Sequence, residues 1–380
     1  MDAQFDALFS ATWNKVALLK PKGLPHTDFF RHYYRDVLWY VIRDKVSGKY
    51  HRFSPAAHHM LSLIDGQRNI GEIWTLALGQ LKDDVPTQDE TIQLFRQLTD
   101  CDLIQFDGLV NHKEVIRKND LKQQRDLKQL LWNPLSFRFK LWNPDAFLDK
   151  TLKFVEPFLG KAGFVVWLMI VSLGIVEAIA NWEALTKDIS NIAFSPDNLI
   201  IMILVYPCIK LCHELGHAYM SKLWGGEVNE MGVMLVVFMP IPYVEASSSS
   251  VFRSKYRRMT VAAAGIAVEL VLATLALLLW LNMEPSLARS VIYNVMMIGG
   301  VSTLLFNGNP LLRFDGYYVF NDAIEVPNLG IRASQYVGFL VKHYILGDKQ
   351  SVAPATTNDE KAWLFSYGIA SGIYKFLLTF

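Results

Sequence analysis

The sequence has few cysteines and almost no net charge. Three of its 380 residues are cysteine, and they form neither a C-x-x-C pair nor a disulfide framework. Lysine and arginine number 37, against 36 aspartate and glutamate residues, so the chain lacks the basic excess of nucleic-acid-binding proteins. The first residues contain no positively charged segment followed by an apolar run. They are not a signal peptide, and we expect the N-terminal part to stay in the cytoplasm.

Apolar residues are abundant, and they gather in long runs. Hydrophobic residues make up 52% of the chain and charged residues 19%, which predicts a protein that is partly soluble and partly embedded in a bilayer. A membrane-crossing helix needs about 20 such residues. The segments near this length are 162–180, 198–224, 259–281, 290–308 and, at the end of the chain, 361–380. The region 333–346 is amphipathic, and we expect it to lie at the membrane surface.

Charges in the short loops predict the orientation of these segments. Lysines and arginines precede the first and third segments, at positions 150, 153, 161, 253, 255, 257 and 258. The loop 181–197 carries three acidic residues and one lysine. Because lysine and arginine favour the cytoplasmic side, the first and third segments run outward and the second and fourth run inward. The chain is therefore expected to be a multi-pass membrane protein with a cytoplasmic N-terminus.

The second apolar segment contains the motif His213-Glu214-Leu215-Gly216-His217. On a helix, residues i and i+4 share a face, so both imidazoles can bind one zinc ion. Glu214 stands where a carboxylate can take a proton from a zinc-bound water. Histidines that pack in a core or reach for the interface are the plainer interpretation, but ionisable groups at membrane depth mark functional sites by default.

A catalytic zinc usually has three protein ligands, so one more is needed. The best candidate is Asp315, which ends a polar segment that begins at Asn307, just after the fourth apolar segment. Gly316 follows it and lets the chain turn closely. An ordinary Asp-Gly turn is the alternative. Glu269, inside the third segment, is the competing carboxylate, unless it is a buried structural acid.

The first third of the chain reads as a small α+β domain. Strand-like runs at 38–43 and 49–53 flank a turn, helices are expected at 54–64, at 69–81 and from Thr87 onward, and a strand at 103–106. This winged-helix-like order, with residues such as Trp39-Tyr40 and Tyr50-His51-Arg52-Phe53, resembles the PqqD-like peptide-binding domains over about residues 15–108. The resemblance implies capture of a peptide as a strand added to the hairpin edge. A winged helix that docks on the membrane part is the alternative, and the absence of a basic helix face argues against nucleic acid.

A linker connects the soluble and membrane parts. We assign 1–110 to the soluble domain, 111–160 to the linker and 161–380 to the membrane domain. Because aromatic and cationic residues mix in the linker, we expect interfacial helices there, and an ordinary linker helix is the alternative. Within the membrane domain, 231–244 is apolar but contains Pro240 and Pro242, which predicts a re-entrant or edge-strand element that could accept a substrate strand. Glu245 follows, and we expect it to be exposed at the boundary; a functional carboxylate is the alternative.

The spacing of both motifs resembles the site-2 protease family of intramembrane zinc metalloproteases. That family combines H-E-x-x-H with N-x-x-P-x-x-x-x-D-G on a later helix, here Asn307, Pro310, Asp315 and Gly316, and the resemblance covers about residues 160–320. It implies one Zn²⁺ held by His213, His217 and Asp315, Glu214 as the base, and Asn307 as a polar group that steadies substrate or the oxyanion.

The closer resemblance, through Asn-Pro-Leu-Leu-Arg-Phe-Asp-Gly-Tyr-Tyr, is to the bacterial peptide zinc metalloproteases. It implies the bacterial inner (cytoplasmic) membrane, a peptide or membrane-protein substrate and an export adaptor as partner. A non-proteolytic peptide-binding component of an export or immunity system is the alternative. A di-iron membrane enzyme would need more histidines, since the membrane part otherwise offers only His343.

Overall fold

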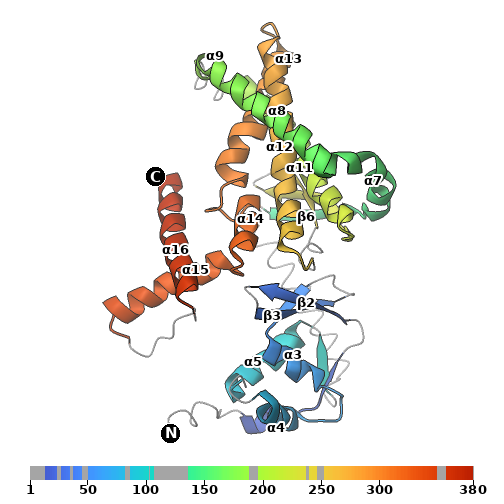
Figure 1. Cartoon of the computed structure of the whole chain (residues 1–380), viewed down its shortest axis with the longest axis vertical. Helices are drawn as coiled ribbons and strands as arrows, with labels where there is room; N and C mark the ends of the chain where they lie inside the picture. The colour runs from blue at the N-terminus through green and yellow to red at the C-terminus, as the bar shows by residue number, and fades with distance from the viewer. Residues whose placement is uncertain are drawn as a thin grey trace. The chain divides into compact units, whose positions relative to one another are not determined.

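The computed structural model describes residues 13–23, 27–34, 37–44, 50–81, 86–101, 103–106, 136–187, 196–236, 239–245, 252–348 and 357–379. The chain divides into two compact units, Met1–Pro134 and Leu135–Phe380, coloured blue to cyan and green to red in Figure 1. The second unit thus begins before the membrane domain expected from residue 161, and it includes the end of the expected linker 111–160.

The first unit contains two small antiparallel sheets and short helices. Strands β2 (Thr27–Tyr34), β3 (Val37–Asp44) and β4 (Tyr50–Phe53) form one sheet in that order, and β1 (Pro21–Gly23) pairs with β5 (Ile104–Phe106). The helices are α2 (Trp13–Val16), α3 (Pro55–Ser62), α4 (Ile70–Leu81) and α5 (Gln88–Asp100). The expected elements are present, whereas β2 and β1 were not foreseen.

Local capping explains where these helices begin. The Ser54 hydroxyl accepts a hydrogen bond from the Ala57 N–H at the start of α3, as an N-cap does. Thr87 and Glu90 exchange hydrogen bonds at the start of α5 in a capping box, which its sequence spacing predicts. The apolar faces of the helices and sheet meet in one core, which includes Ile42, Phe53, Met60, Ile70, Ile73, Phe95 and Leu98.

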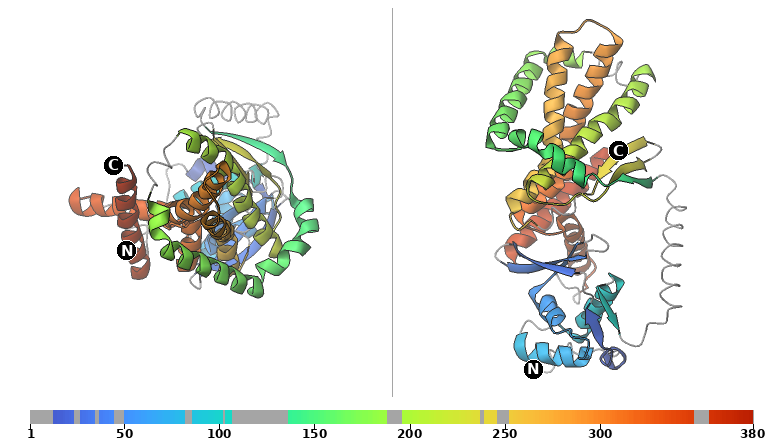
Figure 2. Two further views of the ribbon diagram at one scale, coloured as in Figure 1. Left: turned by 90° about the horizontal axis from the view of Figure 1, so that it is seen from above. Right: turned by 90° about the vertical axis from the view of Figure 1, so that its right-hand side faces the viewer.

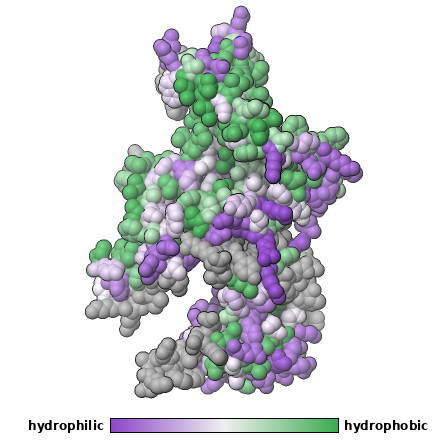
Figure 3. All heavy atoms as spheres, viewed as in Figure 1, coloured by the Kyte–Doolittle hydropathy of each residue, from purple (hydrophilic) through white to green (hydrophobic). Residues whose placement is uncertain are grey.

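The second unit is mostly helical, and four of its helices are long and apolar enough to cross a membrane. They are α8 (Lys161–Ala180), α11 (Pro196–Leu223), α12 (Lys255–Leu281) and the continuous pair α13 (Leu287–Met296) and η3 (Met297–Asn307). Large apolar side chains stay exposed along them, as on Phe164, Leu168 and Ile203, and Figure 3 shows apolar residues covering this part of the surface. Such a surface suits lipid rather than water.

Besides α7 (Asp145–Leu159) and the short α9 (Trp182–Thr186), further helices of this unit follow the segment after η3. They are α14 (Asp315–Ile324), α15 (Leu329–Leu340), the short η4 (Val341–Ile345) and α16 (Asn358–Thr379). The end of the chain, expected as a fifth span over 361–380, is indeed helical, but α16 is not among the four helices with the required length and apolar character. It packs on α15 around a core that includes Leu329, Ala333, Leu364 and Tyr367.

A three-stranded sheet in the second unit corrects the expectation for the linker. Strand β6 (Ser136–Trp142) pairs with β7 (Met231–Val236), which pairs with β8 (Met239–Val244), all antiparallel. The aromatic and cationic residues expected at an interfacial helix therefore lie in a strand, followed by helix α7 (Asp145–Leu159). The proline-containing stretch 231–244 is a hairpin, and within the described residues β8 is an edge strand, as one of the two interpretations predicted.

Small residues allow the membrane-length helices to approach closely. A Cβ atom on Gly216 of α11 would lie 3.0 Å from the Ala264 carbonyl oxygen of α12, and one on Gly174 of α8 would lie 2.3 Å from Thr274 Oγ1. In addition, the Trp167 indole of α8 donates to the Ala267 carbonyl of α12 at 2.9 Å. Small residues at such crossings are how membrane helices pack. Helix α12 is thereby the central helix against which α8 and α11 are fixed, and Figure 2 shows it among its neighbours.

Candidate metal centre

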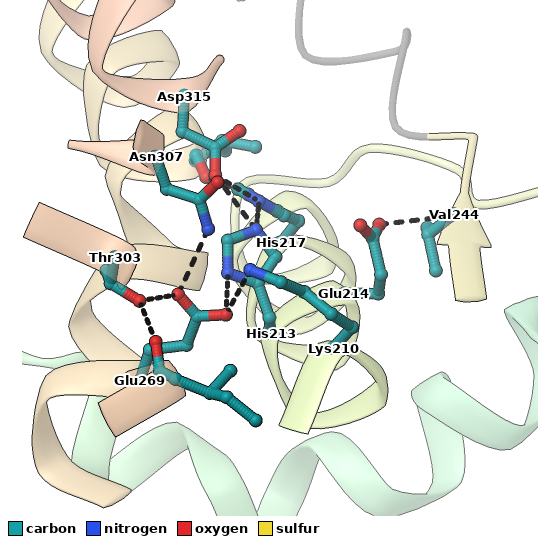
Figure 4. A network of polar contacts seen from close by, with 11 residues as sticks. Lys210, His213, Glu214, His217, Val244, Glu269, Thr303, Asn307 and Asp315 are labelled. Atoms are coloured by element: carbon teal, nitrogen blue, oxygen red, sulfur yellow. Dashed lines mark hydrogen bonds and ion pairs between the residues drawn. The ribbon is translucent and has the colours of Figure 1, made fainter. Parts of the chain in front are cut away.

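Helix α11 and the start of α14 bring three ligand-type atoms together. His213 Nε2 lies 2.8 Å from Asp315 Oδ2, His217 Nε2 lies 3.4 Å from the same oxygen, and the two Nε2 atoms are 3.0 Å apart. Figure 4 shows the three side chains converging. Tetrahedral zinc with bonds of about 2.0–2.1 Å places its ligand atoms roughly 3.3 Å apart. The three residues predicted as ligands thus lie where one ion would fit, with their ligand atoms within 4.8 Å of one another.

The hydrogen-bond partners of the two imidazoles determine which nitrogen faces the centre. His217 Nδ1 lies 2.7 Å from the Val261 carbonyl oxygen, and His213 Nδ1 lies 3.2 Å from Glu269 Oε1. The carbonyl only accepts hydrogen bonds, so Nδ1 of His217 carries the proton and its Nε2 presents a lone pair. Nδ1 of His213 is close to the Glu269 carboxylate without a well-aligned hydrogen bond, and this negative charge favours a proton on the same nitrogen. Two lone pairs and a carboxylate oxygen then meet without a donor between them. Such a group is stable around a cation.

The environment of Asp315 favours the ionised form that metal binding requires. Burial opposes ionisation of this carboxyl, but positive charge at His213 and His217 holds its pKa below the usual value, and a cation held between the imidazoles would supply that charge instead. Gly316 allows the start of α14 to lie against the backbone of Gly308, because a Cβ at this position would lie 2.4 Å from the Gly308 carbonyl. The glycine that follows the aspartate therefore has a packing reason, as the sequence indicated.

Gly265 of α12 leaves the space that the two imidazoles occupy. A Cβ at this position would lie 2.4 Å from His213 Nε2 and 2.6 Å from His217 Nε2. Contacts this short do not occur between real atoms, so no side chain fits here beside the histidines. The close approach of α12 to α11 thus shapes a cradle for the three inward-facing atoms. The sequence held no signal for this, since it is a property of the helix crossing.

Glu214 is partly buried beside the histidines, and its carboxylate accepts a hydrogen bond from the Val244 N–H of β8 at 3.0 Å. Figure 4 shows the side chain turned toward this strand. The free edge of β8 therefore faces the helix that carries the motif. Successive residues of a strand alternate sides, so Pro240 and Pro242 face the same edge as Val244. Prolines have no N–H, which leaves Val244 as the donor along this edge.

Asn307 and Glu269 contact each other instead of the three inward-facing atoms. The Asn307 amide nitrogen donates to Glu269 Oε2 at 3.1 Å. Glu269 reaches the outer nitrogen of His213, and Asp315 stands in the third ligand position that the sequence had left open between the two acids. Of the two interpretations of Glu269, the buried and hydrogen-bonded acid is the one that the structure supports, since the residue is fully buried. Glu245, in contrast, is exposed.

Sequence reasoning missed Lys210 and Thr303, both of which contact Glu269. Lys210 Nζ lies 2.6 Å from Glu269 Oε1, and the Thr303 hydroxyl donates to Oε2. Lys210 did carry a signal, because a lysine inside an apolar segment marks a functional position by default. Thr303 carried none, since a threonine in a membrane helix is common.

Comparison with protein-family models, with curated proteins and with solved structures finds no match to this chain. What the site can do therefore follows from the chemistry of its own residues.

Proposed function

We propose that this chain is a zinc metalloprotease of the site-2 protease type, which hydrolyses a peptide bond in or near the membrane. The observation that carries the proposal is the meeting of His213 Nε2, His217 Nε2 and Asp315 Oδ2 within 4.8 Å on elements that adjoin membrane-length helices. The carboxylate of Glu214, on the same helix as the two histidines, is the second feature that supports the proposal. Its hydrogen bond from the Val244 N–H needs only an acceptor, whereas taking a proton from water needs a carboxylate.

The residues have separate roles in the proposed reaction. His213, His217 and Asp315 would hold a zinc ion, which when bound lowers the pKa of water to about 7 and polarises a carbonyl. Glu214 takes the proton of the attacking water and passes it to the leaving amine nitrogen, as a general base and then acid. Asn307 is the last residue of η3. Its side-chain amide would donate to the substrate carbonyl once it leaves Glu269.

Substrate delivery is proposed to use strand pairing. An extended peptide could lie along β8, donating its N–H groups to the carbonyls of Pro240 and Pro242 and accepting from Val244. Accepting the Val244 N–H would release Glu214 from its hydrogen bond, so that binding of substrate frees the base. The first unit, with its three-stranded sheet, would capture the peptide before cleavage, and an export adaptor would act on the product.

The test is cleavage by the purified chain in lipid nanodiscs, with casein and a set of single-span membrane peptides as probes. Glu214→Gln should retain one zinc per chain and lose about 10²–10⁴-fold in rate, the usual contribution of a general base. Removal of zinc by a chelator should abolish cleavage, and added zinc should restore it. His213→Ala is the matched control, since it should lose both zinc and activity.

Three outcomes would contradict the proposal. Undiminished turnover by Glu214→Gln would remove the assigned base. Stoichiometric zinc without cleavage of any probe would favour the alternative, a peptide-binding membrane component that does not cut. A chain with bound iron instead of zinc in metal analysis would contradict the proposed cofactor.

A further inference from the structure

Glu269 is a fully buried carboxylate in the middle of α12, and four donor groups surround it. Lys210 Nζ lies 2.6 Å and His213 Nδ1 lies 3.2 Å from Oε1. The Thr303 hydroxyl and the Asn307 amide both donate to Oε2. Figure 4 shows this carboxylate between the histidine helix on one side and η3 on the other. One side chain therefore joins three membrane-length helices at the level of the metal centre.

The number of donors fixes the chemical form of Glu269. An ionised carboxylate accepts only and offers about four lone-pair sites, which suits the three hydrogen bonds from Lys210, Thr303 and Asn307 and the nearby Nδ1 of His213. A protonated carboxyl or a glutamine would bring its own hydrogen toward one of them. Lys210, whose side chain is 9% exposed, supplies the opposite charge, because an unpaired buried carboxylate is very costly. Removing either Lys210 or Glu269 would therefore leave the charge of the other buried without its counter-ion.

The location of Lys210 connects this pair to the metal centre. It precedes His213 by three residues on α11, so the two side chains share a face of the helix. Both contact the same oxygen of Glu269, and His213 does so through the nitrogen that points away from Asp315. A carboxylate in this position is the usual partner that holds a metal-binding imidazole in one tautomer and orientation. A pair that served helix packing alone would not need to contact the histidine.

We infer that Glu269, paired with Lys210, is a positioning residue that holds His213 with Nε2 toward the metal. The inference rests on the metal centre of the proposed function, but not on cleavage. The outer nitrogen of His217, Nδ1, faces the neutral Val261 carbonyl, whereas that of His213 faces a carboxylate. The two imidazoles therefore differ in basicity. Replacing Glu269 should therefore affect metal binding chiefly through His213.

The experiment measures metal binding by the full chain in nanodiscs, without substrate. Zinc affinity comes from competition with a coloured chelator, and the ligand geometry from the visible absorption spectrum of the Co²⁺-loaded chain. Glu269→Gln should weaken zinc binding 10–100-fold, the usual effect of losing such a partner, and should change the cobalt spectrum. Lys210→Met should do the same, whereas Lys210→Arg, which keeps the charge, should stay within a few-fold of the wild type.

The double variant Lys210→Met/Glu269→Gln should lose less than the product of the two single losses, because residues of one network couple. Asp145→Asn is the matched control. It removes one of the two carboxylates that contact Lys222, further along α11, at 2.9 Å, while Asp149 stays 2.8 Å from the same ammonium, and it should leave zinc affinity within twofold. Circular dichroism and gel filtration check that each variant is folded.

A second measurement needs no variant. Nitrogen NMR of the wild-type chain with labelled histidine shows which ring nitrogen carries the proton, and Nδ1–H on His213 is expected with zinc bound. Zinc bound through Nδ1, or a folded Glu269→Gln chain with unchanged affinity and cobalt spectrum, would overturn the inference even if the chain cleaves peptides. The expected affinity losses in a chain that cleaves nothing would support the inference and contradict the proposed protease.

Discussion

The proposed metal centre depends on which nitrogen of each imidazole faces it. Each histidine uses Nδ1 toward an acceptor, the Val261 carbonyl for His217 and Glu269 for His213, which leaves Nε2 for a cation. The H-E-x-x-H spacing predicts the two histidines and Glu214, and the second motif predicts Asp315. The sequence also indicates Glu269 as a buried acid, but it does not predict that Lys210 contacts it, because contacts between side chains 59 residues apart depend on how α11 crosses α12.

Gly265→Ala tests the cradle at the residue scale. The added methyl group would lie 2.4 Å from His213 Nε2, so the imidazoles must move or the helices must separate. We expect at least a tenfold loss of zinc affinity, because ligands displaced by a few tenths of an ångström no longer match the ion.

Gly300→Ala is the control for this variant. It adds the same atom in a neighbouring helix, with Ala273 Cβ at an ordinary 3.5 Å as its contact. Zinc affinity should stay unchanged and stability should remain equal or rise slightly. Equal zinc affinity in Gly265→Ala and the wild type, measured by chelator competition, would show that the two imidazoles do not lie against α12.

At the scale of elements, the segment between η3 and α14 is fixed by α16. The Tyr367 hydroxyl donates to the Pro310 carbonyl at 3.0 Å, the Ser371 hydroxyl donates to the Leu311 carbonyl at 3.2 Å, and the Tyr374 hydroxyl donates to the Leu305 carbonyl at 3.1 Å. These bonds hold the residues that lead to Asp315. The last helix, read from the sequence as a fifth span, thus serves as a brace for the loop that presents the third ligand.

Tyr367→Phe tests this brace. The variant keeps the ring, which packs in a core with Leu364 and Tyr317, and removes only the hydroxyl, so the loop loses one hydrogen bond worth about 0.5–1.5 kcal/mol. We expect a lower melting temperature and a several-fold weaker zinc affinity. Tyr318→Phe, at a residue that is 53% exposed, is the control and should change neither. Unchanged zinc affinity in Tyr367→Phe would mean that the loop keeps its place without the Tyr367 hydrogen bond.

The same scale shows which elements the sequence could predict. Long apolar runs gave the four membrane-length helices within a few residues, since length and hydropathy alone decide them. Strand β6 was missed although Phe137, Phe139 and Leu141 alternate with Arg138 and Lys140, a period of two that is typical of a strand. Aromatics beside cations also suit a membrane surface, and only its pairing partner β7, some 95 residues away, decides between the two.

For the whole molecule, the connectivity places like charges at one side of the helices. Helix α8 begins at Lys161, α11 ends after Lys222, and α12 begins at Lys255, followed by Arg257 and Arg258. Because successive helices alternate in direction, these ends lie on the same side if all of them cross a bilayer. The other ends carry Glu183 and Glu284. His213 stands ten residues before the end of α11, about 15 Å from the basic side at 1.5 Å per residue.

This charge distribution predicts that the basic side faces the cytoplasm. In a cysteine-free background, single cysteines at Glu183, Glu284 and Tyr256 can be tested with a membrane-impermeant maleimide on intact cells. Glu183→Cys and Glu284→Cys should react, and Tyr256→Cys, at a residue that is 69% exposed near the start of α12, should react only after permeabilisation. The metal centre would then lie within reach of the cytoplasmic side, where a captured peptide could enter. Labelling of Tyr256→Cys in intact cells, with Glu284→Cys protected, would reverse the orientation and leave the first unit on the wrong side to deliver a cytoplasmic precursor.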